Sequence, residues 1–216
     1  RGSHSAIAAI AALVLLGALM KPSYLMALLP AAGLLALVGW KRTDWRVIVT
    51  LGVTTVVLLA LQFAFYYQSN TEGVTIIFAP LMVIGLYSDT SSLTLVGKLL
   101  ASIAFPLAVL LCFPRTWSDT RSRLAWLTFA IGSAYGYVLA EGGGQADNGN
   151  FLWSGQLAAF VLFAASVWLV VSAVHEEHSR ARALSRATWM RIVACAILFA
   201  AHVVSGVRHL HSSWFA

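Results

Sequence analysis

The residues best suited to chemistry lie in a polar, glycine-rich stretch, residues 137–153, with the sequence YVLAEGGGQADNGNFLW. This stretch holds two of the eight carboxylates of the chain, Glu141 and Asp147, and it contains no lysine or arginine. A carboxylate in such a loop can act as a general base toward a hydroxyl acceptor, or it can coordinate a divalent cation. Its glycines permit positive φ angles and close approach of the backbone to a ligand, although a loop of this composition can also be simply a turn.

Few other residues can contribute to the same site, because the chain is 60% hydrophobic and only 10% charged. We expect substrate-binding groups at Lys21, Asp89, Asn148, Asn150 and Arg208. Two alternatives stay open. Lys21 can serve as an interfacial lysine whose aliphatic stem lies along apolar surface. Asp89 can cap the helix that begins near Ser91 or Ser92. No residues are assigned to a metal, since His209 and His211 have a poor spacing for one helical face.

The composition excludes an ordinary soluble domain, in which about 25% of residues are charged. Several runs of roughly 16 to 24 mostly apolar residues match the hydrocarbon thickness of a bilayer. The sequence therefore predicts an all-α fold, a polytopic helical membrane bundle with about seven transmembrane helices and one short re-entrant or interfacial segment. The expected spans are 5–20, 24–40, 47–67, 93–113, 124–140, 151–174 and 192–207, and the short segment is 76–87.

The distribution of cations predicts the orientation of these spans. Ten of the fourteen Lys and Arg residues fall within 41–46, 114–123 and 175–191. Cytoplasmic loops are enriched in such residues, so these segments are predicted inside and the glycine-rich loop outside, where Trp153 marks the outer interface. A rival arrangement places two crossings between residues 73 and 114, which reverses the later loops. Because the cations lie mostly in these loops, the net charge of +6 is explained by membrane orientation and by contact with anionic lipid headgroups, and it does not indicate nucleic-acid binding.

The remaining features bear on domain organisation and packing. Residues 1–4, RGSH, look like the remnant of an expression tag, and residues 5–216 are expected to form a single transmembrane helical domain, from a chain that can be part of a longer protein. Both cysteines fall within predicted spans and are interpreted as buried thiols. Gly132, Gly136 and Gly155 supply small residues for close contact between helices.

The segment 12–30, ALVLLGALMKPSYLMALLP, resembles a stretch in the C-type superfamily of membrane glycosyltransferases. In that family an apolar helix ends in a lysine with Pro or Gly, and a second apolar helix with an internal proline follows; the basic turn at 40–46 is also similar. The resemblance implies a polyprenyl-phosphate-linked sugar donor, action on the outer face of the inner membrane, and Lys21 near the donor phosphate. The family's large external loop with its catalytic carboxylate is missing, so the resemblance implies the C-terminal part of such an enzyme.

The preferred hypothesis is a multi-pass protein of the bacterial inner membrane that acts in envelope glycan or lipid assembly. It would transfer a sugar from a lipid-phosphate carrier at the external face, with the bilayer and a lipid-linked substrate as its partners. A cofactor is not assigned, and a divalent cation held by the loop carboxylates stays open. Two alternatives remain: a transporter or flippase-like protein with a polar path through Asp89, Lys98, His202 and Ser205, and a non-catalytic scaffold that binds partner membrane helices.

Overall fold

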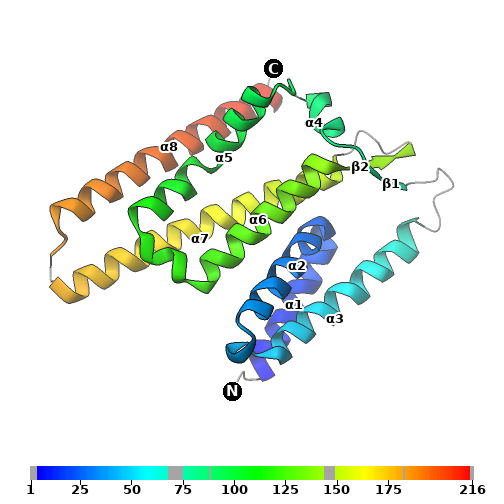
Figure 1. Ribbon diagram of the computed structural model, residues 1–216, viewed down its shortest axis with the longest axis horizontal. Helices are drawn as coiled ribbons and strands as arrows, with labels where there is room; N and C mark the ends of the chain where they lie inside the picture. Colours follow the sequence, from blue (N-terminus) through cyan, green and yellow to red (C-terminus); the bar gives the residue numbers. More distant parts are fainter. Residues whose placement is uncertain (1–3, 68–74, 88, 144–148, 182, 215–216) are drawn as a thin grey trace. The chain divides into compact units, whose positions relative to one another are not determined.

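The computed structural model describes residues 4–67, 75–87, 89–143, 149–181 and 183–214, and most of this part of the chain is helical (Figure 1). The chain divides into two compact units. The first contains Arg1–Thr90 and Leu124–Ala158, and the second contains Ser91–Arg123 and Ala159–Ala216. The prediction of a single domain over residues 5–216 stays a prediction, and the two units are described in turn.

Three helices of the first unit pack against one another: α1 (His4–Met20), α2 (Pro22–Val38) and α3 (Trp45–Gln62). Their shared core includes Val14, Leu25 and Leu51. Pro22 occupies the first turn of α2, where its missing N–H would have no helical partner in any case. A short 3-10 turn, η1 (Trp40–Arg42), follows α2, and a π-helical turn, η2 (Phe63–Tyr67), follows α3. These helices begin and end close to the limits predicted from the apolar runs.

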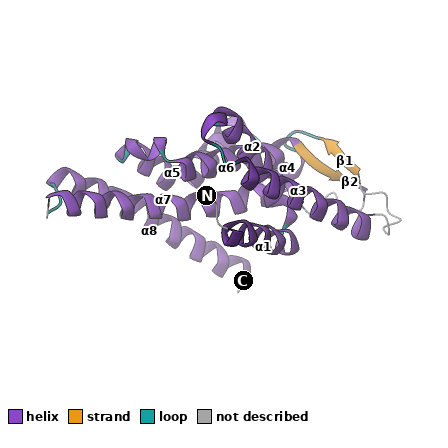
Figure 2. Cartoon of the chain, turned by 90° about the horizontal axis from the view of Figure 1, so that it is seen from below, coloured by secondary structure: helices purple, strands orange, loops and turns teal. Residues whose placement is uncertain are grey.

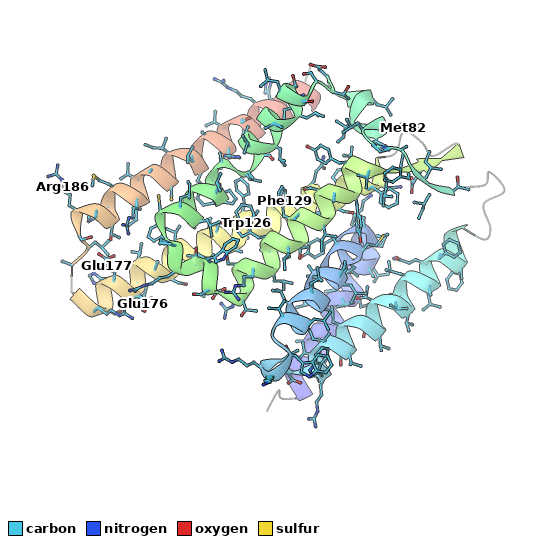
Figure 3. The ribbon with its side chains drawn as sticks, viewed as in Figure 1. Met82, Trp126, Phe129, Glu176, Glu177 and Arg186 are labelled. Atoms are coloured by element: carbon cyan, nitrogen blue, oxygen red, sulfur yellow. The ribbon has the colours of Figure 1, made fainter. Side chains whose placement is uncertain are left out.

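Close contact between α6 (Thr120–Val138) and the first turns of α7 (Asn150–Ala181) depends on glycine. A Cβ atom added at Gly132 would lie 2.8 Å from the backbone oxygen of Ser154, and one at Gly155 would lie 3.1 Å from the Cα of Ser133. The prediction that small residues bring these helices together is therefore confirmed. On α6 itself, Trp126 and Phe129 meet edge to face with ring centroids 6.4 Å apart (Figure 3).

A two-stranded antiparallel sheet departs from the predicted all-α fold (Figure 2). Strand β1 (Thr75–Phe78) pairs with β2 (Leu139–Gly142), and Ile76 lies opposite Glu141. The segment predicted as re-entrant or interfacial, 76–87, thus begins as a strand and ends as a short helix, α4 (Met82–Tyr87). Between them Leu81 has a φ of 63°, and its N–H donates to the carbonyl of Tyr137 at 2.8 Å. The strands form because their backbone groups bond to each other, which satisfies them without a helix.

The second unit contains α5 (Ser92–Cys112), the 3-10 turn η3 (Pro114–Ser118), the remainder of α7, and α8 (Arg186–Trp214). Its core includes Phe105, Val109, Phe113, Leu169 and Cys195, and both cysteines are free thiols. Helices α7 and α8 extend beyond their predicted ends into the basic segment 175–191.

Serine side chains cap the two helices that begin in this unit. The N-cap of α5 is Ser91, whose Oγ accepts from the N–H of Thr94 at 3.4 Å, so the capping role considered for Asp89 belongs to the residue two positions later. At the start of α8, the Oγ of Ser185 accepts from the N–H of Thr188 at 3.1 Å. Such a side chain satisfies one of the N–H groups that the first turn of a helix leaves unpaired.

Four helices in the described part of the chain are long and apolar enough to cross a membrane: Trp45–Phe65, Ser92–Cys112, Asn150–Arg180 and Arg186–Arg208. Large apolar side chains are also exposed on them, as at Phe160 on α7 and Ile197 on α8. This agrees with the predicted class of helical membrane protein. The predicted number of about seven spans includes α1, α2 and α6 as well, and for these three helices it stays a prediction.

Candidate functional site

Three of the predicted site residues form a hydrogen-bonded series in the first unit. The Nζ of Lys21 donates to Oδ1 of Asn150 at 3.3 Å. The Nδ2 of Asn150 in turn donates to Oε2 of Glu141 at 2.8 Å. The amide thus lies between a cation and a carboxylate that are 120 residues apart in the sequence (141 − 21). The structure brings together one residue from the α1–α2 junction and two from the glycine-rich stretch.

Each of these residues lies where a helix or strand begins or ends. Lys21 is the N-cap of α2 and has an extended backbone, with φ −159° and ψ 96°, because the proline after it disfavours a helical conformation there. Glu141 lies in β2, and the pairing with β1 fixes its backbone. Asn150 is the first residue of α7 and follows Gly149, whose φ of 59° is one that glycine adopts without strain. The site therefore depends on the sheet that the sequence did not predict.

The order of charges explains how a carboxylate can be buried here. Glu141 is only 6% exposed, and burial of a charged group is unfavourable without a hydrogen-bond partner. The Asn150 amide supplies an N–H donor to Glu141 and a carbonyl acceptor to Lys21. The reverse orientation of the amide would oppose donors to donors and acceptors to acceptors. The hydrogen-bonding capacity of the three side chains thus selects one arrangement.

An aromatic ring and a serine complete the surroundings. The Nζ of Lys21 lies 5.2 Å from the ring centroid of Trp153, within the range of a cation–π interaction. The Oγ of Ser154 donates to the carbonyl of Ser23 at 2.9 Å in a buried contact that ties α7 to the first turn of α2. Ser23 itself has a buried hydroxyl with no hydrogen-bond partner. This contact holds the helix ends that carry Lys21 and Asn150 next to each other.

The other predicted site residues are not placed in this series. Asp147 and Asn148 lie outside the residues that the structure describes. Asp89 is exposed between α4 and α5, and Arg208 is exposed near the end of α8 in the second unit. Sequence reasoning assigned Trp153 to the membrane interface and did not include it in the site. Its spacing of three from Asn150, which places both residues on one helical face, is the signal that could have found it.

The described residues contain no cluster of three or more His, Cys, Asp and Glu side chains that could hold a metal ion. Glu141 would be a single carboxylate ligand, and Asn150 an amide whose oxygen already accepts from Lys21. A divalent cation would therefore need ligands from outside this series, such as a substrate phosphate. The arrangement itself is suited to holding an anion beside Lys21 and to keeping a carboxylate in a fixed position.

Comparisons with protein-family models, with curated proteins and with solved structures give no match to this chain. Fold and composition therefore define only a broad class: a helical protein in which four of the described helices are long and apolar enough to cross a membrane. The candidate site is a polar series within that apolar chain.

Proposed function

We propose that the first unit binds the phosphate of a lipid-linked sugar and transfers the sugar to a hydroxyl acceptor at the external face of the bacterial inner membrane. The single observation that supports this proposal is the series from Lys21 through Asn150 to Glu141. It places a cation and a carboxylate on either side of one amide, in a chain in which only 10% of residues are charged. The resemblance of residues 12–30 to the C-type membrane glycosyltransferases points to the same chemistry.

Each residue has a definite role in the proposed reaction. Lys21 holds the phosphate as a point charge, and the Trp153 ring, whose centroid lies 5.2 Å from the Nζ, supports the lysine through a cation–π interaction. Asn150 positions both the lysine and the carboxylate. The lipid tail stays in the bilayer, where it contacts the exposed apolar side chains of the helices. Only the phosphate and the sugar therefore need polar contacts.

In the proposed transfer step, residues of the series move the proton and stabilise the leaving group. Glu141 accepts the proton of the acceptor hydroxyl as the oxygen of that hydroxyl forms a bond to the anomeric carbon of the sugar. The bond between that carbon and the phosphate oxygen breaks, and the electron pair stays on the phosphate. The charge that develops on the leaving phosphate is stabilised by Lys21, an interaction that strengthens in the transition state. General base catalysis of this kind contributes about 10²–10⁴-fold to a rate.

A transfer assay in membranes tests the proposal. Membranes containing the full chain are supplied with a radiolabelled polyprenyl-phosphate-linked sugar, and incorporation into acceptor is followed. Glu141→Gln keeps the size of the side chain and its bond to Asn150 but removes the base, so we expect turnover to fall by about 10²–10⁴-fold. Lys21→Gln is expected to raise the donor concentration needed for half-maximal rate, because the phosphate loses its cation.

The matched control is Lys41→Gln, which removes an exposed cation of the same unit from η1, outside the series. Its activity should equal that of the parent. Turnover at the parent level in both Glu141→Gln and Lys21→Gln would rule out this site. Uptake of substrate into vesicles without transfer would instead support a transporter. His202 is one residue of the polar path predicted for a transporter, and its Nδ1 lies 3.1 Å from the carbonyl oxygen of Leu198 in the same helix.

A further inference from the structure

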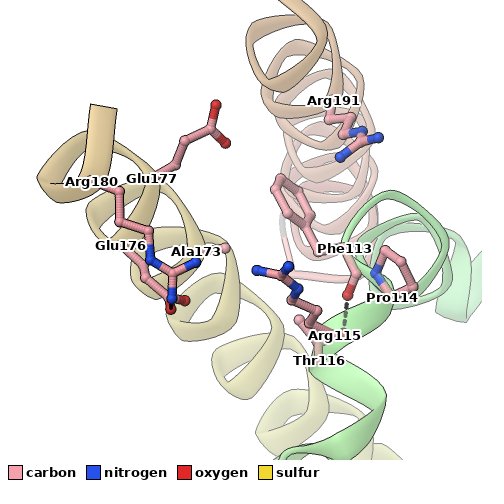
Figure 4. Close-up of a pocket in the computed structure, with 9 residues that line it drawn as sticks. All are labelled: Phe113, Pro114, Arg115, Thr116, Ala173, Glu176, Glu177, Arg180 and Arg191. Carbon is pink, nitrogen blue, oxygen red and sulfur yellow. Dashed lines mark hydrogen bonds and ion pairs between the residues drawn. The ribbon is translucent and has the colours of Figure 1, made fainter. Parts of the chain in front are cut away.

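A second polar site lies in the second unit, where η3 and the charged ends of α7 and α8 enclose a cavity of about 360 Å³ (Figure 4). Three arginines and two glutamates line it: Arg115 from η3, Arg180, Glu176 and Glu177 from α7, and Arg191 from α8. Phe113 and Ala173 add an apolar wall. Three guanidinium groups against two carboxylates leave one net positive charge in the cavity.

The two carboxylates already have partners. Glu176 forms an ion pair with Arg180 one helical turn later. Glu177 accepts from the backbone N–H of Ser185 at 3.0 Å and from Oγ1 of Thr188 at 2.5 Å. These bonds hold the Glu176 carboxylate beside α7 and the Glu177 carboxylate beside the start of α8. Neither carboxylate forms an ion pair with Arg115 or Arg191.

Arg115 and Arg191 are the arginines left for a ligand. The ion pair in this cavity joins Arg180 to Glu176 and includes neither Arg115 nor Arg191. Arg191 and Glu177 interact electrostatically at longer range, but they do not form an ion pair. Figure 4 shows the guanidinium group of Arg115 extending from η3 toward α7, and that of Arg191 on α8, on the other side of the Phe113 ring. A planar guanidinium binds phosphate through two parallel N–H donors, so two arginines that line one cavity from different elements can share one tetrahedral anion.

The position of the cavity indicates that this anion belongs to a lipid. The apolar length of α5 ends at Cys112, three residues before Arg115, and the apolar length of α8 begins at Ile192, directly after Arg191. Two exposed tryptophans, Trp117 and Trp189, lie two residues from these arginines. Tryptophan prefers the headgroup level of a bilayer, and basic pockets between helices at that level bind phospholipid headgroups.

We propose that this cavity binds the phosphate of an anionic phospholipid of the inner leaflet, with Arg115 and Arg191 as its ligands. The wall formed by Phe113 and Ala173 contacts the glycerol and the first methylenes of the lipid. The site is separate from the proposed transfer reaction, and neither proposal depends on the other. A free phosphate shares the same charge and hydrogen-bond acceptors, so the experiment distinguishes the two sources.

The full chain in neutral detergent is titrated with short-chain phosphatidylglycerol, with phosphatidylcholine and with inorganic phosphate, and the thermal unfolding midpoint is followed by tryptophan fluorescence. Phosphatidylglycerol should raise the midpoint saturably, because a ligand that binds the folded state stabilises it. The double variant Arg115→Gln/Arg191→Gln should weaken this binding by about tenfold or more, since each charge-assisted hydrogen bond to phosphate is lost.

The matched control is Arg186→Gln, an exposed arginine at the start of α8 that does not line the cavity (Figure 3). It should leave the affinity unchanged within about twofold, because distant exposed charges are largely screened. If the double variant alone unfolds at a lower temperature, Arg115→Lys and Arg191→Lys keep the charge and should still lose affinity. Parent-like binding in the double or lysine variants would overturn the site. Saturation by inorganic phosphate with an affinity equal to that of the lipid would overturn the assignment to a lipid.

Discussion

Replacement of Gly132 by alanine tests whether the contact between α6 and α7 is as close as the structure describes. The new Cβ would lie 2.8 Å from the carbonyl oxygen of Ser154, whereas ordinary contact begins at 3.4 Å, so the backbones must separate by 0.6 Å (3.4 − 2.8). Overpacking of this kind destabilises by about 1–3 kcal/mol. Alanine also stabilises a helix by about 1 kcal/mol relative to glycine, which offsets part of this loss. We therefore expect Gly132→Ala to lower the free energy of unfolding by up to about 2 kcal/mol.

The matched control is Gly33→Ala, in α2 of the same unit, where an added Cβ meets nothing within 4 Å. It should raise the free energy of unfolding by up to about 1 kcal/mol, because only the helix propensity changes. Both variants are titrated with sodium dodecyl sulfate in mixed micelles, and unfolding is followed by circular dichroism. The difference between them isolates the steric effect. Equal changes in the two variants would show that α6 and α7 do not approach closely at this position.

Two further predictions concern polar groups away from the candidate site. Thr55 on α3 is fully buried, and its hydroxyl has no hydrogen-bond partner, so Thr55→Val should raise the free energy of unfolding by about 1–3 kcal/mol; a decrease in the same titration would show that the hydroxyl is paired. Ser185 caps α8 through its bond to the N–H of Thr188, so Ser185→Ala should destabilise the chain by about 0.5–2 kcal/mol in thermal unfolding. Ser185→Thr keeps the hydroxyl acceptor without adding a charge beside Glu177 and should retain the parent stability, and a loss equal to that of the alanine variant would argue against a capping role.

The helices could be predicted from the sequence because apolar runs of bilayer length leave few other folds. The breaks at Lys21–Pro22 and around Asp44 gave the ends of the first helices within a few residues. The end of α7 was predicted too early, at 174, since charged residues signal the end of an apolar run but not the end of a helix. Glu176 and Arg180 in fact support the last turns as an i,i+4 pair.

The strand pair could not be predicted in the same way. Thr75–Phe78 is a short apolar run, and such runs do not distinguish a strand from a turn of helix. Leu139 and Ala140 continue the apolar run of α6, so the run itself does not mark where the helix ends and the strand begins. The paired residues are 61 to 67 positions apart in the sequence (139 − 78 and 142 − 75), and pairing over that distance depends on how the intervening chain folds.

A physical reason explains why the three residues of the hydrogen-bonded series were all among the predicted site residues. Charged residues are scarce in this chain, so the predicted orientation alone placed Lys21, Glu141 and Asn150 on one side of the membrane. Their hydrogen bonds depend on the position of β2, which the sequence did not give. The same argument included Arg208, which belongs to the second unit.

Helix α7 has 32 residues, which corresponds to a length of about 48 Å, while the hydrocarbon layer of a bilayer is about 30 Å thick. The surplus must be taken up by inclination of the helix or by protrusion of its charged turns, and the balance between the two changes with the length of the surrounding acyl chains. In a thin membrane the turns that carry Glu176 and Arg180 would stand clear of the headgroups, and in a thick one they would be drawn among them. If α7 crosses a bilayer, the length of the acyl chains is therefore expected to change how this end of the helix meets the membrane surface.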